Sequence, residues 1–132
     1  MIAEETQQKT VLVVEDDTSM QQALQERLRE DGYNVLVAAD VDGGLAELRA
    51  NHVDLLLLDL RLGSKSGLDL MDEMHDDKSI NDQNIPVVVL TAIADPAMVG
   101  DVMGRGPTDY LVKSDNSLDD ISIHIKKKLA EG

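Results

Sequence analysis

The hydrophobic residues of this chain gather in short runs separated by polar segments. Apolar runs at 11–14, 34–38, 53–58, 86–90 and 110–112 predict five β-strands. The third run contains four consecutive leucines, Leu55 to Leu58, which is typical of a strand buried on both faces of a parallel sheet. Proline opens the fourth run, a position where a strand tolerates it.

Between these runs, apolar residues recur every three or four positions, as they do along one face of a helix. This spacing predicts five helices, which are marked by Met20, Ala23, Leu24 and Leu28, by Leu45 and Leu48, by Leu68, Met71 and Met74, by the residues after Asp95-Pro96, and by Leu118, Ile121, Ile125 and Leu129. Gly32 is typical of a helix end, and the Asp95-Pro96 pair is typical of a helix start. Residues 121–125 also fit the alternation of a strand.

Five strands alternating with five helices predict an α/β fold, in which helices cover both faces of an open, doubly wound parallel sheet. A length of 132 residues suits a single domain, 1–132, with a core from about 10 to 129. Residues 76–84, which are rich in Asp, Asn and Ser, are expected to be the least ordered part of it.

Polar side chains follow four of the predicted strands. Glu15 and Asp16 follow the first strand, Asp59 the third, Thr91 the fourth and Lys113 the fifth. Because parallel strands bring their carboxyl ends to one edge of the sheet, where such folds bind ligands, we expect these residues to converge. Neighbouring carboxylates repel one another, and an oxygen-seeking cation such as Mg²⁺ relieves the repulsion. The pattern therefore indicates phosphoryl transfer to Asp59.

A simpler interpretation of the same acidic residues is also open. Negative charge is favourable at a helix N-terminus, so Glu15, Asp16 and Asp17 could serve only the helix that follows them. Asp59 could likewise be a helix cap or a solvated loop residue.

The composition of the chain limits which partners, metal sites and cellular locations we expect. A net charge of −14 argues against direct binding of nucleic acid, which needs a basic surface. The absence of cysteine excludes disulfides and thiolate metal sites. No apolar stretch approaches the ~20 residues of a membrane span, and the first residues lack a basic, apolar signal sequence. We therefore expect a cytoplasmic protein that does not bind membranes.

Five segments, in this order along the chain, resemble the receiver domain of two-component response regulators. They are Val13–Asp17, Leu57–Asp59, Gly67, Val89–Ala92 and Tyr110–Lys113, and the resemblance extends from about Thr10 to Leu129. The chain is similar in particular to the single-domain, chemotaxis-regulator-like members of this family. The resemblance implies a flavodoxin-like (βα)5 three-layer sandwich with strand order 2-1-3-4-5. It also implies a phosphoacceptor signalling domain, rather than an enzyme, that promotes its own phosphorylation and dephosphorylation.

The resemblance implies a role for each residue at the strand ends. Asp59 would accept a phosphoryl group from the phosphohistidine of a sensor histidine kinase or phosphotransfer protein. Thr91 and Lys113 would contact the phosphoryl oxygens. Asp16, Asp59 and the backbone carbonyl of Arg61 would bind Mg²⁺, with Glu15 acting mainly through water.

The resemblance also implies how the signal leaves the domain. Thr91 and Tyr110 would form a switch, although Tyr110 could serve packing alone. Output would run through the fourth helix, fifth strand and fifth helix, to a downstream protein target or a phosphorylation-dependent homodimer. Ile123 lies off the apolar stripe of the last helix and should face solvent near Lys126–Lys128, or else pack against the neighbouring helix.

Two positions depart from the family pattern. Ser114 follows Lys113, where the family commonly has proline, often after a cis bond. A cis bond before a non-proline residue costs about 2.5–4 kcal/mol, so this loop is either trans or strained. The loop after Asp59 reads Leu62-Gly63-Ser64-Lys65-Ser66 without the usual Met-Pro. We expect it to be more mobile, and its lysine to alter the phosphate environment.

Rival classes fit the residues less well. A haloacid-dehalogenase-type phosphatase needs a second Asp where Arg61 stands. A phosphate-loop NTPase needs glycine at Ser64 and at Asp59. A flavodoxin-like electron carrier needs a phosphate-binding loop after the first strand, where Glu-Asp-Asp would repel the phosphate. The remaining alternative is a degenerate receiver that acts as a phosphorylation-independent protein interaction module.

Overall fold

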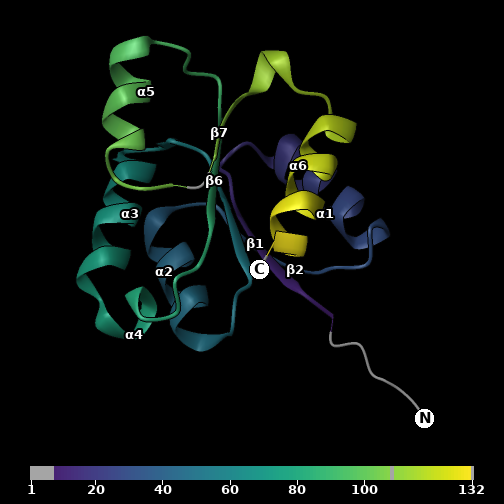
Figure 1. Cartoon of the computed structure of the whole chain (residues 1–132), viewed down its shortest axis with the longest axis horizontal. Coiled ribbons are helices and arrows are strands. Elements are labelled where there is room, and N and C mark those ends of the chain that lie inside the picture. The colour runs from purple at the N-terminus through teal and green to yellow at the C-terminus, as the bar shows by residue number, and fades with distance from the viewer. Residues whose placement is uncertain (1–7, 108, 132) are drawn as a thin grey trace.

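Five strands of the chain form one parallel sheet. The computed structural model describes residues 8–107 and 109–131. The sheet contains β1 (Thr10–Val14), β2 (Asn34–Ala38), β3 (Leu55–Leu58), β6 (Val87–Thr91) and β7 (Asp109–Val112). Their order is β2-β1-β3-β6-β7, with every neighbouring pair parallel (Figure 1). Counted in chain order within this sheet, the predicted order 2-1-3-4-5 is confirmed.

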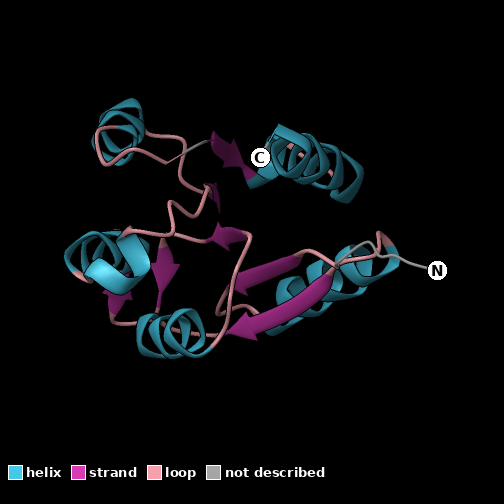
Figure 2. Cartoon of the chain, turned by 60° about the horizontal axis from the view of Figure 1, so that its bottom comes forward, coloured by secondary structure: helices cyan, strands magenta, loops and turns pink. Residues whose placement is uncertain are grey.

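Helices cover both faces of the sheet, as predicted. On one face lie α1 (Thr18–Glu30) and α6 (Leu118–Glu131). On the other lie α2 (Val41–Ala50), α3 (Gly67–Asp76), the single turn α4 (Lys78–Asn81) and α5 (Pro96–Met103), as Figures 1 and 2 show. A 3₁₀ turn, η1 (Lys113–Asp115), joins β7 to α6. In the part of the chain that the structure describes, no helix is both long and apolar enough to cross a membrane.

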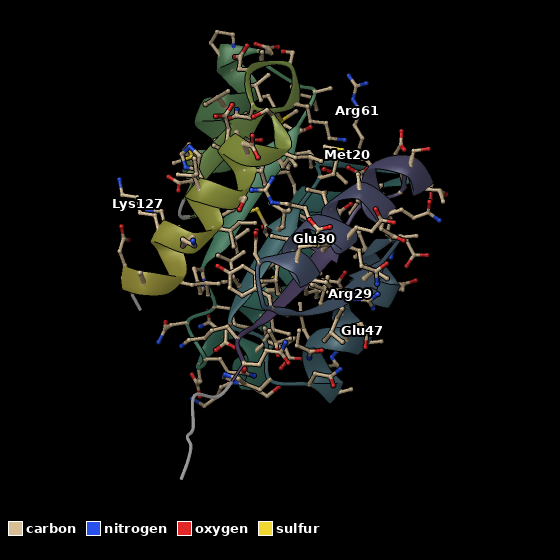
Figure 3. The ribbon with its side chains drawn as sticks, turned by 90° about the vertical axis from the view of Figure 1, so that its right-hand side faces the viewer. Met20, Arg29, Glu30, Glu47, Arg61 and Lys127 are labelled. Atoms are coloured by element: carbon tan, nitrogen blue, oxygen red, sulfur yellow. The ribbon has the colours of Figure 1, made fainter. Side chains whose placement is uncertain are left out.

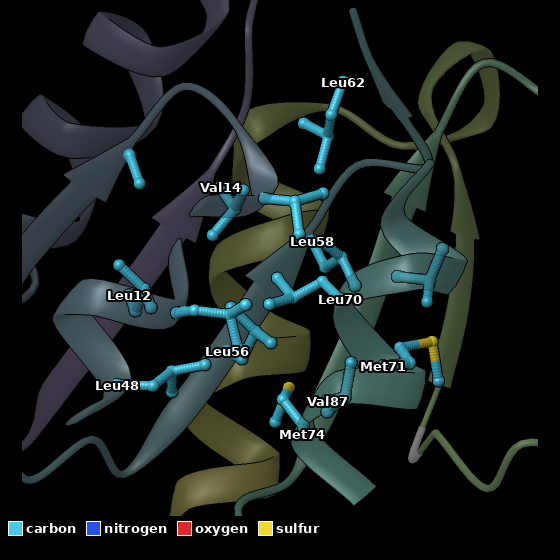
Figure 4. Close-up of a cluster of buried hydrophobic side chains, with 14 of the residues drawn as sticks. Leu12, Val14, Leu48, Leu56, Leu58, Leu62, Leu70, Met71, Met74 and Val87 are labelled. Atoms are coloured by element: carbon cyan, nitrogen blue, oxygen red, sulfur yellow. The ribbon is translucent and has the colours of Figure 1, made fainter. Parts of the chain in front are cut away.

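The leucines of β3 fill the core on both sides of the sheet. Leu55 and Leu57 pack with the residues of α1 and α6, whereas Leu56 and Leu58 pack with those of α2 and α3 (Figure 4). This follows from the alternation of side chains along a strand. All four are at most 1% exposed. Because burying a leucine stabilises by about 1.5–3 kcal/mol, β3 anchors the sheet and fixes the place where it ends.

Local signals in the sequence set most helix boundaries. Asp95 caps α5 by accepting a hydrogen bond from Ala97, and Pro96 occupies the first turn, as predicted. Gly32, with φ +100°, follows the end of α1. Residues 121–125 are helical throughout, because Ile121 and Ile125 point into the core while Ile123 stays 64% exposed. The strand interpretation of this segment is therefore wrong, and the outward position of Ile123 is confirmed.

Two segments are more regular than the sequence suggested. The loop after Asp59, expected to be mobile, forms a small antiparallel hairpin of β4 (Arg61–Leu62) and β5 (Lys65–Ser66). Gly63 allows its turn with φ +68°, and Leu62 is 2% exposed. Residues 76–84, expected to be the least ordered, contain α4, whose Ile80 is buried against the core.

Candidate functional site

The residues expected at the strand ends share one edge of the sheet. Glu15 and Asp16 follow β1, and Asp59 follows β3, next to it. Thr91 closes β6 and pairs with Val112, directly before Lys113. The strands end together because Val14 pairs with Leu58 and Leu58 with Val89. The parallel register therefore brings residues that are up to 98 positions apart in sequence to one site.

Three carboxylates form the centre of this edge. Glu15, Asp16 and Asp59 each offer an oxygen within 4.8 Å of the others. Glu15 is 2% and Asp59 5% exposed, whereas Asp16 is exposed to solvent. Oxygen ligands of this kind, one of them open to water, suit a hard divalent cation that keeps part of its hydration shell. The donor set therefore fits Mg²⁺.

Lys113 connects two of these carboxylates. Its Nζ donates to Glu15 Oε1 at 2.7 Å and to Asp59 Oδ2 at 3.0 Å. Burial alone would lower the pKa of Lys113, but the hydrogen bonds to both carboxylates outweigh it, so the pKa is raised. Burial raises the pKa of Glu15, and the hydrogen bond from Lys113 opposes that rise. One ammonium thus holds together acidic groups that would otherwise repel each other.

Backbone amides hold the two buried carboxylates in place. Arg61 N donates to Asp59 Oδ1 at 3.2 Å, and Asp17 N donates to Glu15 Oε2 at 3.1 Å. The side chain of Arg61 itself is exposed (Figure 3). The carboxylate of Asp17 caps α1 through Met20 N, so for this residue the helix-terminus interpretation is correct.

Sequence reasoning missed one residue that supports the site. Gln21 Nε2 donates to the carbonyl of Glu15 at 3.0 Å and to that of Ala38 at 3.2 Å. It ties the ends of β1 and β2 together from the first turns of α1. A lone glutamine within a helical pattern carries no signal by which this role could have been found.

A glycine permits the close packing below Asp59. A Cβ at Gly67 would lie 2.5 Å from the carbonyl oxygen of Asp59 and 3.0 Å from Leu60 Cα. Gly67 N donates to the carbonyl of Leu60 at 2.9 Å, which fixes the start of α3 against this backbone. The position therefore requires glycine, and it sets where the Asp59 backbone lies.

Thr91 and Tyr110 lie beside the β6–α5 loop. Thr91 is fully buried, and its Oγ1 accepts from Ile93 N at 3.5 Å. The hydroxyl of half-buried Tyr110 donates to the carbonyl of Ile93 at 2.6 Å. Burial, followed by the charges of Asp59 and Asp95, raises the pKa of Tyr110. Both side chains thus contact the same loop, which follows the site directly.

The structure shows the geometry at both departures from the family pattern, Ser114 and the loop that contains Lys65. The bond between Lys113 and Ser114 is trans, and Lys113 still reaches both carboxylates. Lys65 donates to exposed Asp42 on α2 at 3.3 Å. The extra lysine therefore binds a surface carboxylate here, at the hairpin that follows Asp59.

Comparison with known proteins gives a consistent assignment. The family model described as the response regulator receiver domain matches residues 11–125. A response regulator receiver domain protein (CheY-like) from Methanospirillum hungatei JF-1 superposes with a TM-score of 0.85 at 26% identity, over 95% of this chain and 96% of the other. A putative response regulator from Chloroflexus aurantiacus J-10-fl gives a TM-score of 0.83 at 27% identity, covering 94% and 99%.

The chain also matches part of longer curated relatives. The DNA-binding response regulator MtrA of Mycobacterium bovis is 33% identical over 109 residues, which are 83% of this chain and 46% of the relative. The chain spans less than half the length of the curated relatives it matches. DNA binding is a property of MtrA as a whole protein.

Proposed function

Because the chain belongs to the response regulator receiver family, whose domains serve as phosphoacceptors in two-component signalling, we propose that Asp59 is its phosphorylation site. The donor would be the phosphohistidine of a sensor histidine kinase or phosphotransfer protein. The observation that carries the proposal is the convergence of Glu15, Asp16, Asp59 and Lys113 at one sheet edge. A phosphorylation-independent interaction module would not require that convergence.

The chemistry proposed for Asp59 is a displacement at phosphorus. A carboxylate oxygen of Asp59 forms the new bond to phosphorus, while the bond from phosphorus to the donor imidazole nitrogen breaks and the imidazole leaves. Lys113 already donates to Asp59 and can donate to a phosphoryl oxygen that replaces one of its carboxylate partners. The buried hydroxyl of Thr91 is suited to a second phosphoryl oxygen.

We assign Mg²⁺ binding to Asp16, Asp59 and the Arg61 carbonyl, with Glu15 in support. A bound Mg²⁺ would neutralise the negative charge of the phosphoryl group during transfer. Supporting this assignment, the backbone N–H of Arg61 contacts Asp59, which keeps the backbone of residue 61 next to the carboxylate. Water-exposed Asp16 supplies the open side of the site.

Intact mass after treatment with acetyl phosphate tests the phosphorylation. We expect wild type to gain one phosphoryl group with Mg²⁺ and much less without it, and Asp59→Asn to gain none. Equal incorporation in wild type and Asp59→Asn would contradict the proposal. No incorporation into correctly folded wild type would favour the degenerate receiver.

Thermal melting tests the metal site with a matched pair of variants. A ligand that binds only the native state stabilises it by about 2.7 kcal/mol at a hundredfold excess over Kd. Adding Mg²⁺ should therefore raise the Tm of wild type and of Asp17→Asn, which keeps its helix cap. Asp16→Asn should lose most of that rise. The assignment fails if Asp16→Asn keeps the full shift, or if both variants lose it equally.

We place the output on the face formed by α5, β7 and α6. Tyr110 lies in β7 and reaches the loop before α5, and phosphoryl contacts to Thr91 and Lys113 would favour one arrangement of this loop. The partner that binds this face would be a downstream protein or a second copy of the chain. Comparing NMR amide shifts with and without a beryllofluoride mimic tests it. Shifts confined to the loops around Asp59, with Tyr110 and α6 unchanged, would contradict this assignment.

A further inference from the structure

The outer face of α6 carries an ordered pattern of charge. Positions 119, 120, 123, 126 and 127 are three or four residues apart, so they share one side of the helix, and all five are exposed. Ile123 lies at the centre and is 64% exposed, one of two exposed large hydrophobic residues among those the structure describes. Figure 3 shows Lys127 projecting away from the protein.

The charges are symmetric about Ile123. Three positions before and after it are Asp120 and Lys126, and four positions before and after it are Asp119 and Lys127. A helix with this arrangement is complementary to a copy of itself that runs in the opposite direction. Two-fold contacts of this kind, in which the same patch is used on both copies, are the commonest in homo-oligomers.

We propose that two copies of this chain associate through α6, antiparallel, about a two-fold axis at Ile123. The acidic residues 119 and 120 of each copy then face the lysines 127 and 126 of the other, and the two Ile123 side chains meet between them. The proposal depends on the outer face of α6 and not on phosphorylation, so it can hold or fail independently of the function proposed above.

The charged groups are available for such pairing. Within residues 8–107 and 109–131, neither Lys126 nor Lys127 has an ion-pair partner, whereas Lys128 contacts Asp109 and Glu131, each at 3.5 Å. Asp119 binds Arg27 through Oδ1 but remains 77% exposed.

Asp120 offers a carboxylate beside a recess. Its Oδ2 accepts from Ser117 N at 2.9 Å, and the hydrogen bonds with Ser117 lower its pKa and keep it ionised. A hollow of about 300 Å³ next to Ile123 is lined by Asp120, Asp115, Asn116 and His124. A lysine ammonium from a second copy fits this acidic lining.

The net charge of the chain and the small size of the contact both indicate that two copies associate weakly. With a net charge of −14, two copies repel each other at long range, so they can approach closely only where local charges are complementary. A helix of 14 residues is about 21 Å long, and one helix pair buries less than the ~1,200 Å² of a stable interface. We therefore expect a reversible, salt-sensitive dimer.

Sedimentation velocity from micromolar to millimolar concentration tests the proposal at about 0.1 M salt, where repulsion between the two acidic chains is screened beyond ~10 Å. Wild type should shift from monomer to dimer, and added salt should reverse the shift. Ile123→Asp, at an exposed position, should raise the dissociation constant about tenfold or more, as expected when a central interface residue is lost. A chain that stays monomeric at every concentration would overturn the proposal, and this face would then belong to a different partner.

Charge complementation tests the antiparallel arrangement. An acidic variant, K126E/K127E, and a basic variant, D119K/D120N, should each fail to self-associate, while an equal mixture should dimerise because opposite charges then meet at both ends. The change D120N keeps a side-chain oxygen that can accept from Ser117 N. K9E/K78E, at exposed positions outside α6, changes the net charge equally to the acidic variant and should dimerise normally. Dimers that survive in the acidic variant, or a mixture that stays monomeric, would refute the arrangement.

Discussion

Replacing Gly67 by alanine tests how the start of α3 sets the position of Asp59. The new Cβ would lie 2.5 Å from the carbonyl oxygen of Asp59, 0.9 Å short of the 3.4 Å at which ordinary contact begins. All three atoms closer than 3.4 Å belong to the backbone of Asp59 and Leu60, so no side-chain rotation relieves the clash. The hydrogen bond from Gly67 N to Leu60 O also keeps α3 from moving away.

The magnitude follows from two opposing effects. Overpacking of this kind costs about 1–3 kcal/mol or more, whereas replacing glycine by alanine returns about 0.4–1 kcal/mol by restricting the unfolded chain. We therefore expect Gly67→Ala to lower the free energy of unfolding by about 1–2 kcal/mol. Because the displaced backbone carries Asp59, the proposed acceptor, phosphorylation of this variant by acetyl phosphate should also be slower.

Gly100→Ala is the matched control. Gly100 lies within α5, and a Cβ there would meet no atom within 4 Å. The same substitution should stabilise at this position, by about 0.5–1 kcal/mol. Urea denaturation of the two variants and wild type gives both values. Opposite signs support the reasoning, whereas a Gly67→Ala protein as stable as wild type, with unchanged phosphorylation, would refute it.

Three further predictions concern separate parts of the chain. Ile93→Glu should speed loss of phosphate from the isolated domain, since Ile93 offers an attacking water no polar group; an unchanged or slower rate in a phosphate-release assay argues against this. Glu15→Gln should raise the free energy of unfolding at neutral pH, because burial raises the pKa of Glu15 in the folded state. Wild type should gain stability relative to this variant as the pH falls from neutrality through that raised pKa, and urea denaturation across pH would show no such gain if the reasoning fails. Asp77→Ala should cost about 1 kcal/mol, since its carboxylate caps α4 through Ser79; a loss below a few tenths would show that the cap contributes little.

The sheet was predictable because its strands carry strong patterns. The four leucines from Leu55 to Leu58 are typical of a strand buried on both faces, and alternation along the strand places two of them on each side of the sheet. Residues 121–125 were ambiguous because isoleucine at every second position fits a strand, while Ile121 and Ile125, four positions apart, also fit one face of a helix. The structure decides for a helix, because Ile121 and Ile125 pack in the core on the α1 side while Ile123, which would share their face in a strand, is 64% exposed.

Short elements escaped sequence reasoning for lack of length. The hairpin of β4 and β5 has two residues in each strand, too few for any alternation to register. Its Gly63-Ser64 turn was a usable signal, since two-residue hairpin loops favour glycine. Similarly, Asp77 before α4 is a residue type that commonly caps helices, but a helix of one turn is too short to show helical periodicity in the sequence.

The site was predictable as a set of strand ends, but its internal contacts were not. Parallel topology alone brings Glu15, Asp16 and Asp59 to one edge. Whether Lys113 reached them was open, because Ser114 left the geometry of the following bond undecided. The support from Gln21 depends on tertiary contacts with β1 and β2 that no local pattern encodes.

Chemical mapping of the phosphorylated residue tests the central claim most directly. Borohydride reduces an aspartyl phosphate to homoserine, which peptide mass spectrometry can locate after digestion. Wild type treated with acetyl phosphate and Mg²⁺, then reduced, should carry homoserine at position 59. Homoserine at position 16 or at another carboxylate, with Asp59 unmodified, would contradict the account.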